Sequence, residues 1–296
     1  MHLDFVVAGF SKCGTTALCA MLDNHPNIFI PPRFKEPRFF NRANYALHWS
    51  SYRDLFYTAP ADARLGEGSV TYTEWEFAQV CSKRIAKHFP NIKIILVARD
   101  PVVRVESSYR EMHNSDSDWG VEAAPSIEEA LRQMPNILAD TRYWEISSIY
   151  LEHLPKEQLL VLFQEDLKSK PSAVLHQCYQ FLGVDSKIDQ SLDATHLNQG
   201  LDKYYDTPEL KALRDIDQHP EAAQASYGIH SSVENQFMPA LNLRKPFGQG
   251  KHEWSTTAKR QLLHSLADGP EKFLSEYGKP LSFWPRYKAL VEEANL

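Results

Sequence analysis

The first residues with a pattern suited to chemistry form the segment GFSKCGTT, residues 9–16, between a short apolar run and a helical pattern. A glycine-rich turn at that place presents backbone N–H groups and a helix N-terminus, which both favour a phosphate group. The segment has the length of the nucleotide-binding pattern GxxxxGK[ST], but Thr15 takes the place of the Lys, and Lys12 stands three residues earlier. We therefore expect a phosphate site whose cation reaches a leaving oxygen on a group attached to that phosphate.

A second group of polar residues lies in KIILVARDPVVRVESSYREMHN, residues 93–114. Its apolar run ends at Arg99, and ligands of open α/β sheets bind beyond the carboxyl ends of the strands. Asp100 and Pro101 then begin a helix, because Pro suits the first helical turn. A guanidinium binds two phosphate oxygens at once in a bidentate contact. Arg99 together with the hydroxyl of Ser107 therefore predicts a second phosphate site. The alternative is that Arg99 only pairs with Asp100 or another acid.

The elements that position these residues follow from apolar periodicity. Short continuous apolar runs at 5–8, 92–98 and 159–163 are typical of strands buried on both faces of a parallel sheet. Helical periodicities cover residues 16–24, 75–88, 103–112, 127–134, 141–154, 173–182, 256–266 and 270–277. Alternating strands and helices predict an α/β protein: a three-layer P-loop-like fold with a central parallel sheet of about five strands flanked by helices.

Composition limits the classes of protein that fit. The chain has 296 residues, of which 43% are hydrophobic and 24% charged, as expected for a globular protein. Its net charge of −6 disfavours a nucleic-acid or anionic-membrane surface, so no nucleic-acid partner is expected. We find no repeat or linker and expect a single domain over 1–296, with irregular acceptor or lid loops at about 110–140 and 200–255.

Cellular location and cysteine chemistry follow from further absences in the sequence. There is no membrane-spanning run, no secretory signal and no CxxC pair among the four cysteines, so we expect a reducing, cytoplasmic setting and no metal site. Only Cys13 is placed to react, since it lies in the glycine loop. We favour the plainer interpretation that Cys13 is a small residue that fits there. Whether the protein is a monomer or a homodimer stays open.

These motifs together resemble the sulfotransferases that use 3′-phosphoadenosine 5′-phosphosulfate (PAPS), in particular their bacterial and heparan-sulfate-type branch. GFSKCGTTAL resembles the 5′-phosphosulfate loop of that family, and ARDPVVRVESSY resembles its 3′-phosphate strand and helix. KEPRFFNR at 35–42 is similar to the segment that carries the catalytic carboxylate, and GEGSVTY at 66–72 is similar to the strand-end motif that follows. GQGKHEW resembles the closing nucleotide loop.

The resemblance implies an enzyme of class EC 2.8.2.- that transfers a sulfuryl group from PAPS to a hydroxyl, with an amine acceptor left open, and releases adenosine 3′,5′-bisphosphate (PAP) without a metal. It implies that Glu36 is the general base and that Lys12 stabilises the leaving phosphate. The implied acceptor is a carbohydrate, a glycolipid or a small secondary metabolite. The implied nucleotide contacts are Ser11, Lys12, Cys13, Gly14, Thr15, Thr16, Arg99, Ser107, Gly250 and Lys251.

Two departures from the family pattern leave the acceptor and the proton path open. The heparan-type enzymes have Lys where this chain has Gly68, and often His where it has Arg38. His48 and His113 are rivals of Glu36 for the role of base. An ion pair with Lys35 or Arg38 is the structural alternative for Glu36. The expected acceptor wall, chosen mainly for aromatic side chains that stack on sugar or polycyclic faces, comprises Arg38, Trp119, Tyr204, Tyr205, Phe237 and Trp254.

Two other functions share the loop architecture. A P-loop small-molecule kinase would need Lys at position 15 and an acid at a strand end to hold Mg²⁺, whereas the second strand here ends in Arg99. A non-catalytic module that binds adenosine bisphosphate would not need Lys12, because that side chain serves transfer more than product binding. Both alternatives are therefore less well supported than a sulfotransferase.

Overall fold

The computed structural model describes residues 2–32, 35–112, 124, 126–186, 204–206, 244–246 and 252–294. The chain divides into two compact units. The first comprises Met1–Val105, Pro135–Leu197 and Lys259–Leu296, and the second comprises Glu106–Met134 and Asn198–Ala258. Whether the chain is a single domain stays a prediction, and we describe each unit by itself.

The first unit contains a five-stranded sheet in the order β2-β3-β1-β4-β5. The strands are β1 (Phe5–Gly9), β2 (Ile28–Phe29), β3 (Arg64–Glu67), β4 (Lys93–Ala98) and β5 (Leu159–Phe163). All four neighbouring pairs are parallel; β1, for example, aligns Val6 with Glu67 of β3 and with Ile94 of β4. The carboxyl ends of all five strands therefore meet at one edge, as the sequence predicts for a ligand site.

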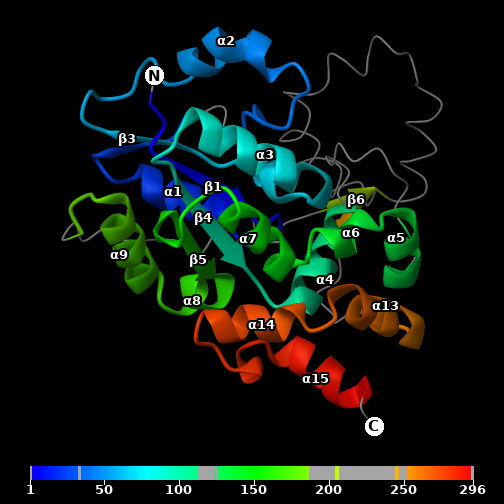
Figure 1. Cartoon of the computed structure of the whole chain (residues 1–296). Helices are drawn as coiled ribbons and strands as arrows, with labels where there is room; N and C mark the ends of the chain where they lie inside the picture. Colours follow the sequence, from blue (N-terminus) through cyan, green and yellow to red (C-terminus); the bar gives the residue numbers. More distant parts are fainter. Residues whose placement is uncertain are drawn as a thin grey trace, which may run out of the picture. The chain divides into compact units, whose positions relative to one another are not determined.

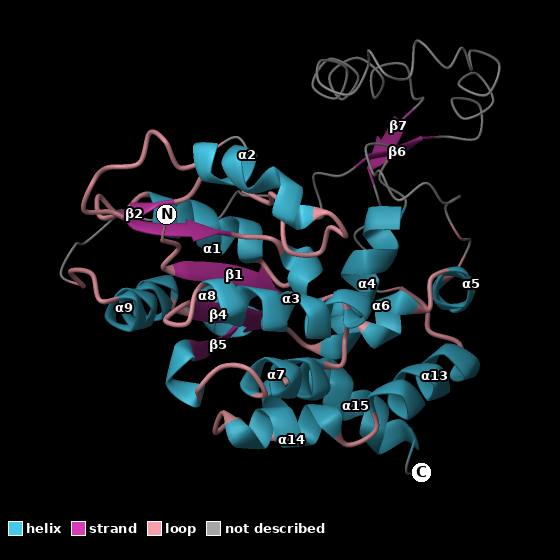
Figure 2. Cartoon of the chain, turned by 45° about the horizontal axis from the view of Figure 1, so that its top comes forward, coloured by secondary structure: helices cyan, strands magenta, loops and turns pink. Residues whose placement is uncertain are grey.

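Helices flank this sheet on both faces (Figures 1 and 2). The helices of the first unit are α1 (Thr15–Asp23), α2 (Trp49–Asp54), α3 (Trp75–His88), α6 (Asn136–Ala139), α7 (Tyr143–Leu151), α8 (Gln164–Ser169), α9 (Pro171–Leu182), α14 (Gly269–Glu276) and α15 (Pro285–Ala294). Short 3₁₀ turns are η1 (Tyr45–His48), η2 (Val70–Thr73), η3 (Lys156–Gln158) and η6 (Leu281–Phe283). None of the described helices is long and apolar enough to cross a membrane.

The second unit is smaller in its described part. It contains α5 (Ile127–Gln133) and an antiparallel pair of short strands, β6 (Tyr204–Asp206) and β7 (Arg244–Pro246). Two helices belong to both units: α4 (Pro101–Met112) begins in the first unit and ends in the second, and α13 (Thr256–Leu266) does the reverse.

The apolar runs explain why the central strands form. Phe5, Val6 and Val7 of β1 are fully buried, and so is β4 from Ile94 to Ala98, because helices cover both faces of a parallel sheet. The three apolar runs of the sequence correspond to β1, β4 and β5, which confirms the α/β prediction. Strands β2 and β3 lack such a run: β3 reads RLGE, and its pairing with β1 on one side and β2 on the other makes it a strand.

Candidate active site

The loop from Gly9 to Gly14 joins the end of β1 to the start of α1. Its bend depends on two residues in the left-handed region, Lys12 with φ 66° and Gly14 with φ 95°. A Cβ on Gly14 would also lie 3.3 Å from Cγ of Gln164, so this position suits only glycine. A left-handed backbone at Lys12 is a strained state that the surrounding contacts must sustain, and such strain is common at functional sites.

The N-terminus of α1 is suited to hold an anion. Helix α1 spans nine residues, and no side chain caps its first turn, where backbone N–H groups and the positive end of the helix dipole converge. Thr15 is buried, whereas the side chain of Thr16 is partly exposed beside it. The sequence-predicted loop and the first turn of α1 are therefore continuous, and together they form the candidate phosphate cradle.

Two arginines hold the backbone of this loop. Arg99, the first residue after β4, donates from Nη1 to the carbonyl of Lys12 at 3.1 Å. Arg104 of α4 donates from Nε to the carbonyl of Ser11 at 3.2 Å. Its Nη1 also donates to the carbonyl of Ile137 and to Oγ1 of Thr141, both at 2.7 Å, and the side chain is only 2% exposed. Arg104 is therefore a buried anchor of the loop.

Arg104 holds the loop but is not among the site residues expected from the sequence motifs. The available signal was its position five residues after Arg99, in the first turns of the helix that follows the strand. The sequence alone does not show that this side chain turns back to the loop, because the contact joins residues 93 positions apart.

The carboxylate of Asp100 binds backbone N–H groups rather than Arg99. Its Oδ1 accepts the N–H of Val102 at 3.0 Å, and its Oδ2 accepts the N–H of Arg286 at 2.9 Å, at the start of α15. Burial raises the pKa of Asp100, while these backbone donors lower it. The carboxylate thus caps two helices, and the structure gives no support to its pairing with Arg99.

Cys13 lies at the base of the loop and is fully buried. Its Sγ lies 3.6 Å from the hydroxyl of Tyr143. Burial raises the pKa of the Cys13 thiol to about 11, although nearby Arg104 lowers it. The thiolate is the reactive form of cysteine, and a raised pKa disfavours it. Cys13 therefore fills space under the loop, as the plainer interpretation of the sequence expects.

The candidate base Glu36 lies beside the cradle. Its Oε1 is 2.7 Å from Nζ of Lys35, and the same Nζ donates to Oγ1 of Thr16 at 3.2 Å. Its Oε2 is 4.0 Å from Nε of Arg38. The structure therefore brings together Glu36, Arg38 and the start of α1, and it also shows the ion pair of Glu36 with Lys35 that the sequence left as an alternative role.

A fully buried carboxylate, Glu67, stands at the end of β3. Its Oε1 accepts the hydroxyls of Tyr72 at 2.7 Å and Tyr52 at 3.2 Å. Its Oε2 accepts Oγ–H of Ser69 at 2.6 Å and the N–H of Ser69 at 3.1 Å. Burial raises the pKa of Glu67 to about 7, and the four hydrogen bonds lower it from what burial alone would produce.

The hydroxyls bound to Glu67 also hold the segment that carries Glu36. Oγ of Ser69 accepts the N–H of Arg38 at 3.0 Å, and the Tyr72 oxygen accepts the N–H of Phe39 at 2.9 Å. An ionised carboxylate only accepts hydrogen bonds, so the hydroxyls of Ser69 and Tyr72 donate to Glu67, and their oxygens accept N–H groups of the segment. This support sustains Arg38 at φ 48°, another left-handed position.

Most of the remaining predicted residues lie in the second unit or outside the described part of the chain. Ser107 and Trp254 belong to the second unit, where the indole N–H of Trp254 donates to Oε1 of the buried Glu106 at 3.0 Å. Tyr204 and Tyr205 form β6, paired with β7, and their side chains are not described. Residues outside the described part of the chain are His113, Trp119, Phe237, Gly250 and Lys251. The predicted roles of all these residues stay predictions.

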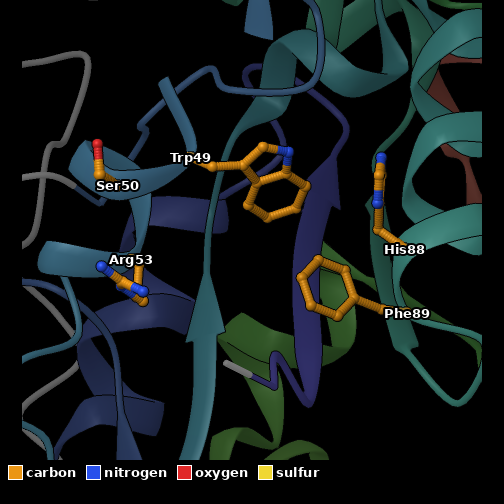
Figure 3. Close-up of a pocket in the computed structure, with 5 residues that line it drawn as sticks. All are labelled: Trp49, Ser50, Arg53, His88 and Phe89. Atoms are coloured by element: carbon orange, nitrogen blue, oxygen red, sulfur yellow. The ribbon is translucent and has the colours of Figure 1, made fainter. Parts of the chain in front are cut away.

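A pocket of about 320 Å³ lies elsewhere in the first unit, between α2 and the end of α3. It is lined by Trp49, Ser50, Arg53, His88 and Phe89, and the Trp49 ring faces His88 across it (Figure 3), with ring centroids 4.8 Å apart. His88 and Phe89 precede β4, whereas the glycine loop follows the end of β1. This pocket is therefore separate from the phosphate cradle.

The parallel sheet and the loop between β1 and α1 define an α/β protein with a P-loop-like fold, and the arginine after β4 lies at the same sheet edge. A sulfotransferase domain model matches residues 2–244 of the chain. The chain therefore belongs to the sulfotransferase domain family, transferases of class EC 2.8.2.- whose sulfuryl donor is PAPS. This confirms the family expected from the sequence motifs.

Relatives and a solved structure agree with this assignment. The chain is 32% identical over 205 residues to bifunctional heparan sulfate N-deacetylase/N-sulfotransferase 3 of Mus musculus, covering 63% of this chain and 23% of that protein. It is 30% identical over 213 residues to the Drosophila melanogaster bifunctional enzyme, covering 63% and 20%. The chain thus spans less than a quarter of these relatives. A sulfotransferase from Alicyclobacillus acidocaldarius shares the fold, with a TM-score of 0.54 and 23% identity over 78% of this chain and 96% of that one.

Proposed function

We propose that this chain transfers the sulfuryl group of PAPS to a hydroxyl or amine of a carbohydrate, with Glu36 as general base and Lys12 at the leaving phosphate. One observation carries the proposal most directly. Glu36 lies one side chain away from the phosphate cradle, because Lys35 joins it to Thr16 at the start of α1. A carboxylate at that place is within reach of an acceptor held against a cradled phosphosulfate.

The residues present suit the donor nucleotide. The first turn of α1 supplies backbone N–H groups and the Thr16 hydroxyl for the 5′-phosphate, and Gly14 lets the backbone approach closely. Arg99 follows the strand edge and donates one hydrogen bond to the loop, so the other N–H donors of its guanidinium suit a second phosphate. We assign it to the 3′-phosphate, the group that distinguishes PAPS from ordinary nucleotides.

The transfer needs alignment and charge stabilisation more than covalent help from the protein. In the proposed step the acceptor oxygen forms a bond to sulfur while the bond from sulfur to the phosphate oxygen breaks. The electron pair stays on the phosphate, where Lys12 stabilises it, and the acceptor proton moves to Glu36. A positioned carboxylate of this kind contributes roughly 10²–10⁴-fold to a rate.

A carbohydrate acceptor is supported by the relatives, which are named for N-sulfation of heparan sulfate. Two of the six residues expected in the acceptor wall, Arg38 and Trp254, have described side chains, and Arg38 lies 4.0 Å from Glu36. Its positive charge suits an acceptor that carries carboxylates, such as a uronic-acid-containing oligosaccharide.

The donor site is tested first, by thermal unfolding with PAP, ADP, or ATP plus Mg²⁺, each with and without a chelator. A ligand at about 100 times its Kd stabilises the folded state by about 2.7 kcal/mol, which is a shift of several degrees in Tm. We expect stabilisation by PAP that a chelator leaves unchanged. Stabilisation only by ATP with Mg²⁺ would contradict the proposal and favour a kinase.

The acceptor is tested with ³⁵S-labelled PAPS and a matched panel. The panel consists of unsulfated heparan oligosaccharides with free amines, the same oligosaccharides with N-acetyl groups, and a simple phenol. Transfer to the first alone indicates an amine acceptor, and transfer to the first two indicates a hydroxyl. Transfer only to the phenol would contradict the carbohydrate proposal, and PAP binding without transfer to any acceptor would favour the non-catalytic module.

A further inference from the structure

We propose that Lys35 is a second cation of the transfer site, which binds the sulfuryl group and holds the general base against it; this inference rests on the proposed function. Lys35 lies outside the glycine loop and outside helix α1, which follows that loop. Its Nζ nevertheless spans from Oε1 of Glu36, at 2.7 Å, to Oγ1 of Thr16, at 3.2 Å. Lys35 therefore contacts both the cradle and the candidate base.

The hydrogen-bonding capacity of Lys35 leaves room for a ligand. An ammonium group has three protons and no acceptor. One faces Glu36 and one faces Thr16, and the third has no protein acceptor among the described residues. Because Glu36 and Thr16 lie on the acceptor and donor sides of the proposed reaction, the third proton is suited to a sulfuryl oxygen between them.

Gly68 explains how the Lys35 side chain reaches this position. The N–H of Gly68 donates to the carbonyl of Lys35 at 2.8 Å, which ties the backbone of the segment to the end of β3. A Cβ on Gly68 would lie 3.3 Å from Cγ of Lys35 and 2.6 Å from Sγ of Cys19. The missing side chain at residue 68 therefore leaves space along which the lysine stem passes.

The position of Lys35 also suits the movement of charge in the reaction. At the start the negative charge lies on Glu36; at the end that carboxylate is protonated, and the charge lies on the phosphate that has lost its S–O bond. A cation between these two places stays close to the charge throughout, so it stabilises the state in which charge is shared over the sulfuryl oxygens. Lys12, on the loop itself, serves the leaving oxygen instead.

A purely structural ion pair is the competing explanation. The side chains of Lys35 and Glu36 are 20% and 25% exposed, and partly solvated pairs of this kind contribute little to folding. A structural role therefore predicts a small effect on stability and none on the chemical step. The two explanations differ in what the loss of the cation does to turnover of a protein that still folds and binds nucleotide.

The test compares Lys35→Met and Lys35→Arg with the wild-type enzyme. The measurements are kcat and KM with PAPS on the oligosaccharide panel, the Kd of PAP by calorimetry, and Tm. We expect Lys35→Met to lose about 100-fold in kcat, with the Kd of PAP and Tm close to the wild-type values, and Lys35→Arg to recover part of the loss. Ethylamine added to Lys35→Ala should also restore part of the rate, because a free ammonium ion can occupy the emptied space.

The matched control is Lys259→Met, which removes a lysine from another partly exposed ion pair, that of Lys259 with Glu293 at 2.6 Å. It should leave kcat unchanged. Wild-type turnover in Lys35→Met would overturn the proposal, and so would a loss explained entirely by weaker PAP binding or lower Tm. If the wild-type enzyme transfers no sulfate, the proposed function fails and the role of Lys35 fails with it, whereas an active wild type with an active Lys35→Met overturns only the role of Lys35.

Discussion

The hydroxyl of Tyr72 donates to the buried carboxylate of Glu67 at 2.7 Å. The same oxygen accepts the N–H of Phe39 at 2.9 Å, three residues after the candidate base. Tyr72 therefore connects the end of a sheet strand to the segment on which Glu36 depends. Because Tyr72 donates its proton to Glu67, its oxygen is left to accept from the segment, so the ionised form of Glu67 sets the direction of these hydrogen bonds.

Tyr72→Phe should lower turnover, because the N–H of Phe39 loses its acceptor and the segment with Glu36 loosens. We also expect the free energy of unfolding to fall by about 1–3 kcal/mol, the cost of leaving buried polar groups unpaired. The matched control is Tyr52→Phe, which removes another donor to Glu67 but no acceptor for the segment. Urea unfolding and kcat with PAPS distinguish the two variants. Equal effects on kcat would contradict the positioning role of Tyr72.

The stability of the protein should depend on pH through Glu67. Its pKa in the folded protein is raised to about 7 from an ordinary value of 4.5 by burial, so between these pH values the folded state binds more protons than the unfolded state. The contribution of Glu67 to the free energy of unfolding therefore falls as the pH rises through this window and levels off above it.

Glu67→Gln removes that titration. The difference in unfolding free energy between Glu67→Gln and the wild type should shift in favour of the variant as the pH rises from about 4.5 to 7. Burial likewise raises the pKa of Glu74 to about 7, but this group is present in both proteins and cancels in the difference. Urea titrations at a series of pH values measure the effect, and a difference that does not vary with pH would refute it.

Arg104 should be needed for the shape of the phosphate cradle. Arg104→Met removes the guanidinium hydrogen bonds to the carbonyls of Ser11 and Ile137, and we expect a loss of about 2–4 kcal/mol in unfolding free energy. Arg104→Lys keeps the charge but not the forked geometry, so it should be more stable than Arg104→Met and still bind PAP more weakly than the wild type. Calorimetric titration with PAP checks this, and wild-type affinity in both variants would show that Arg104 does not shape the site.

Lys12 and Glu36 should affect the chemical step more than the fold. Lys12→Ala should abolish measurable transfer, and Glu36→Gln should lower kcat by roughly 10²-fold or more while leaving the Kd of PAP unchanged. Rapid-quench assays with labelled PAPS, together with Tm, measure both effects. Wild-type turnover in Lys12→Ala would remove that lysine from the mechanism. A loss of nucleotide binding alone in Glu36→Gln would make Glu36 a structural residue.

Arg99 should provide selectivity for the 3′-phosphate. Arg99→Ala should weaken PAP far more than it weakens adenosine 5′-monophosphate, because only PAP carries the second phosphate. A charge-assisted hydrogen bond contributes about 1.5–3 kcal/mol, which is roughly a 10- to 150-fold change in Kd. Competition binding with the two nucleotides gives the ratio. If the preference for PAP persists in the variant, the 3′-phosphate is bound elsewhere.

Much of the fold could be predicted from local pattern. The apolar runs that became β1, β4 and β5 were recognisable because a parallel strand buried on both faces needs apolar residues at every position. The glycine loop was recognisable because only a few sequences make that turn between a strand and a helix. Strand β3, with the sequence RLGE, carries no such pattern, and its pairing with β1 and β2 accounts for its conformation.

The sequence by itself determined the α/β class, the glycine loop between a strand and a helix, and the segment that carries Glu36, because these depend on neighbouring residues. The tertiary structure alone decided that Arg104 holds the loop, that Glu67 supports the segment of Glu36, and that Lys35 spans from Glu36 to Thr16. Each of these relationships depends on a long side chain crossing between separate segments. Its direction is set by the packing of the sheet and by the space beside Gly68, which a linear pattern does not contain.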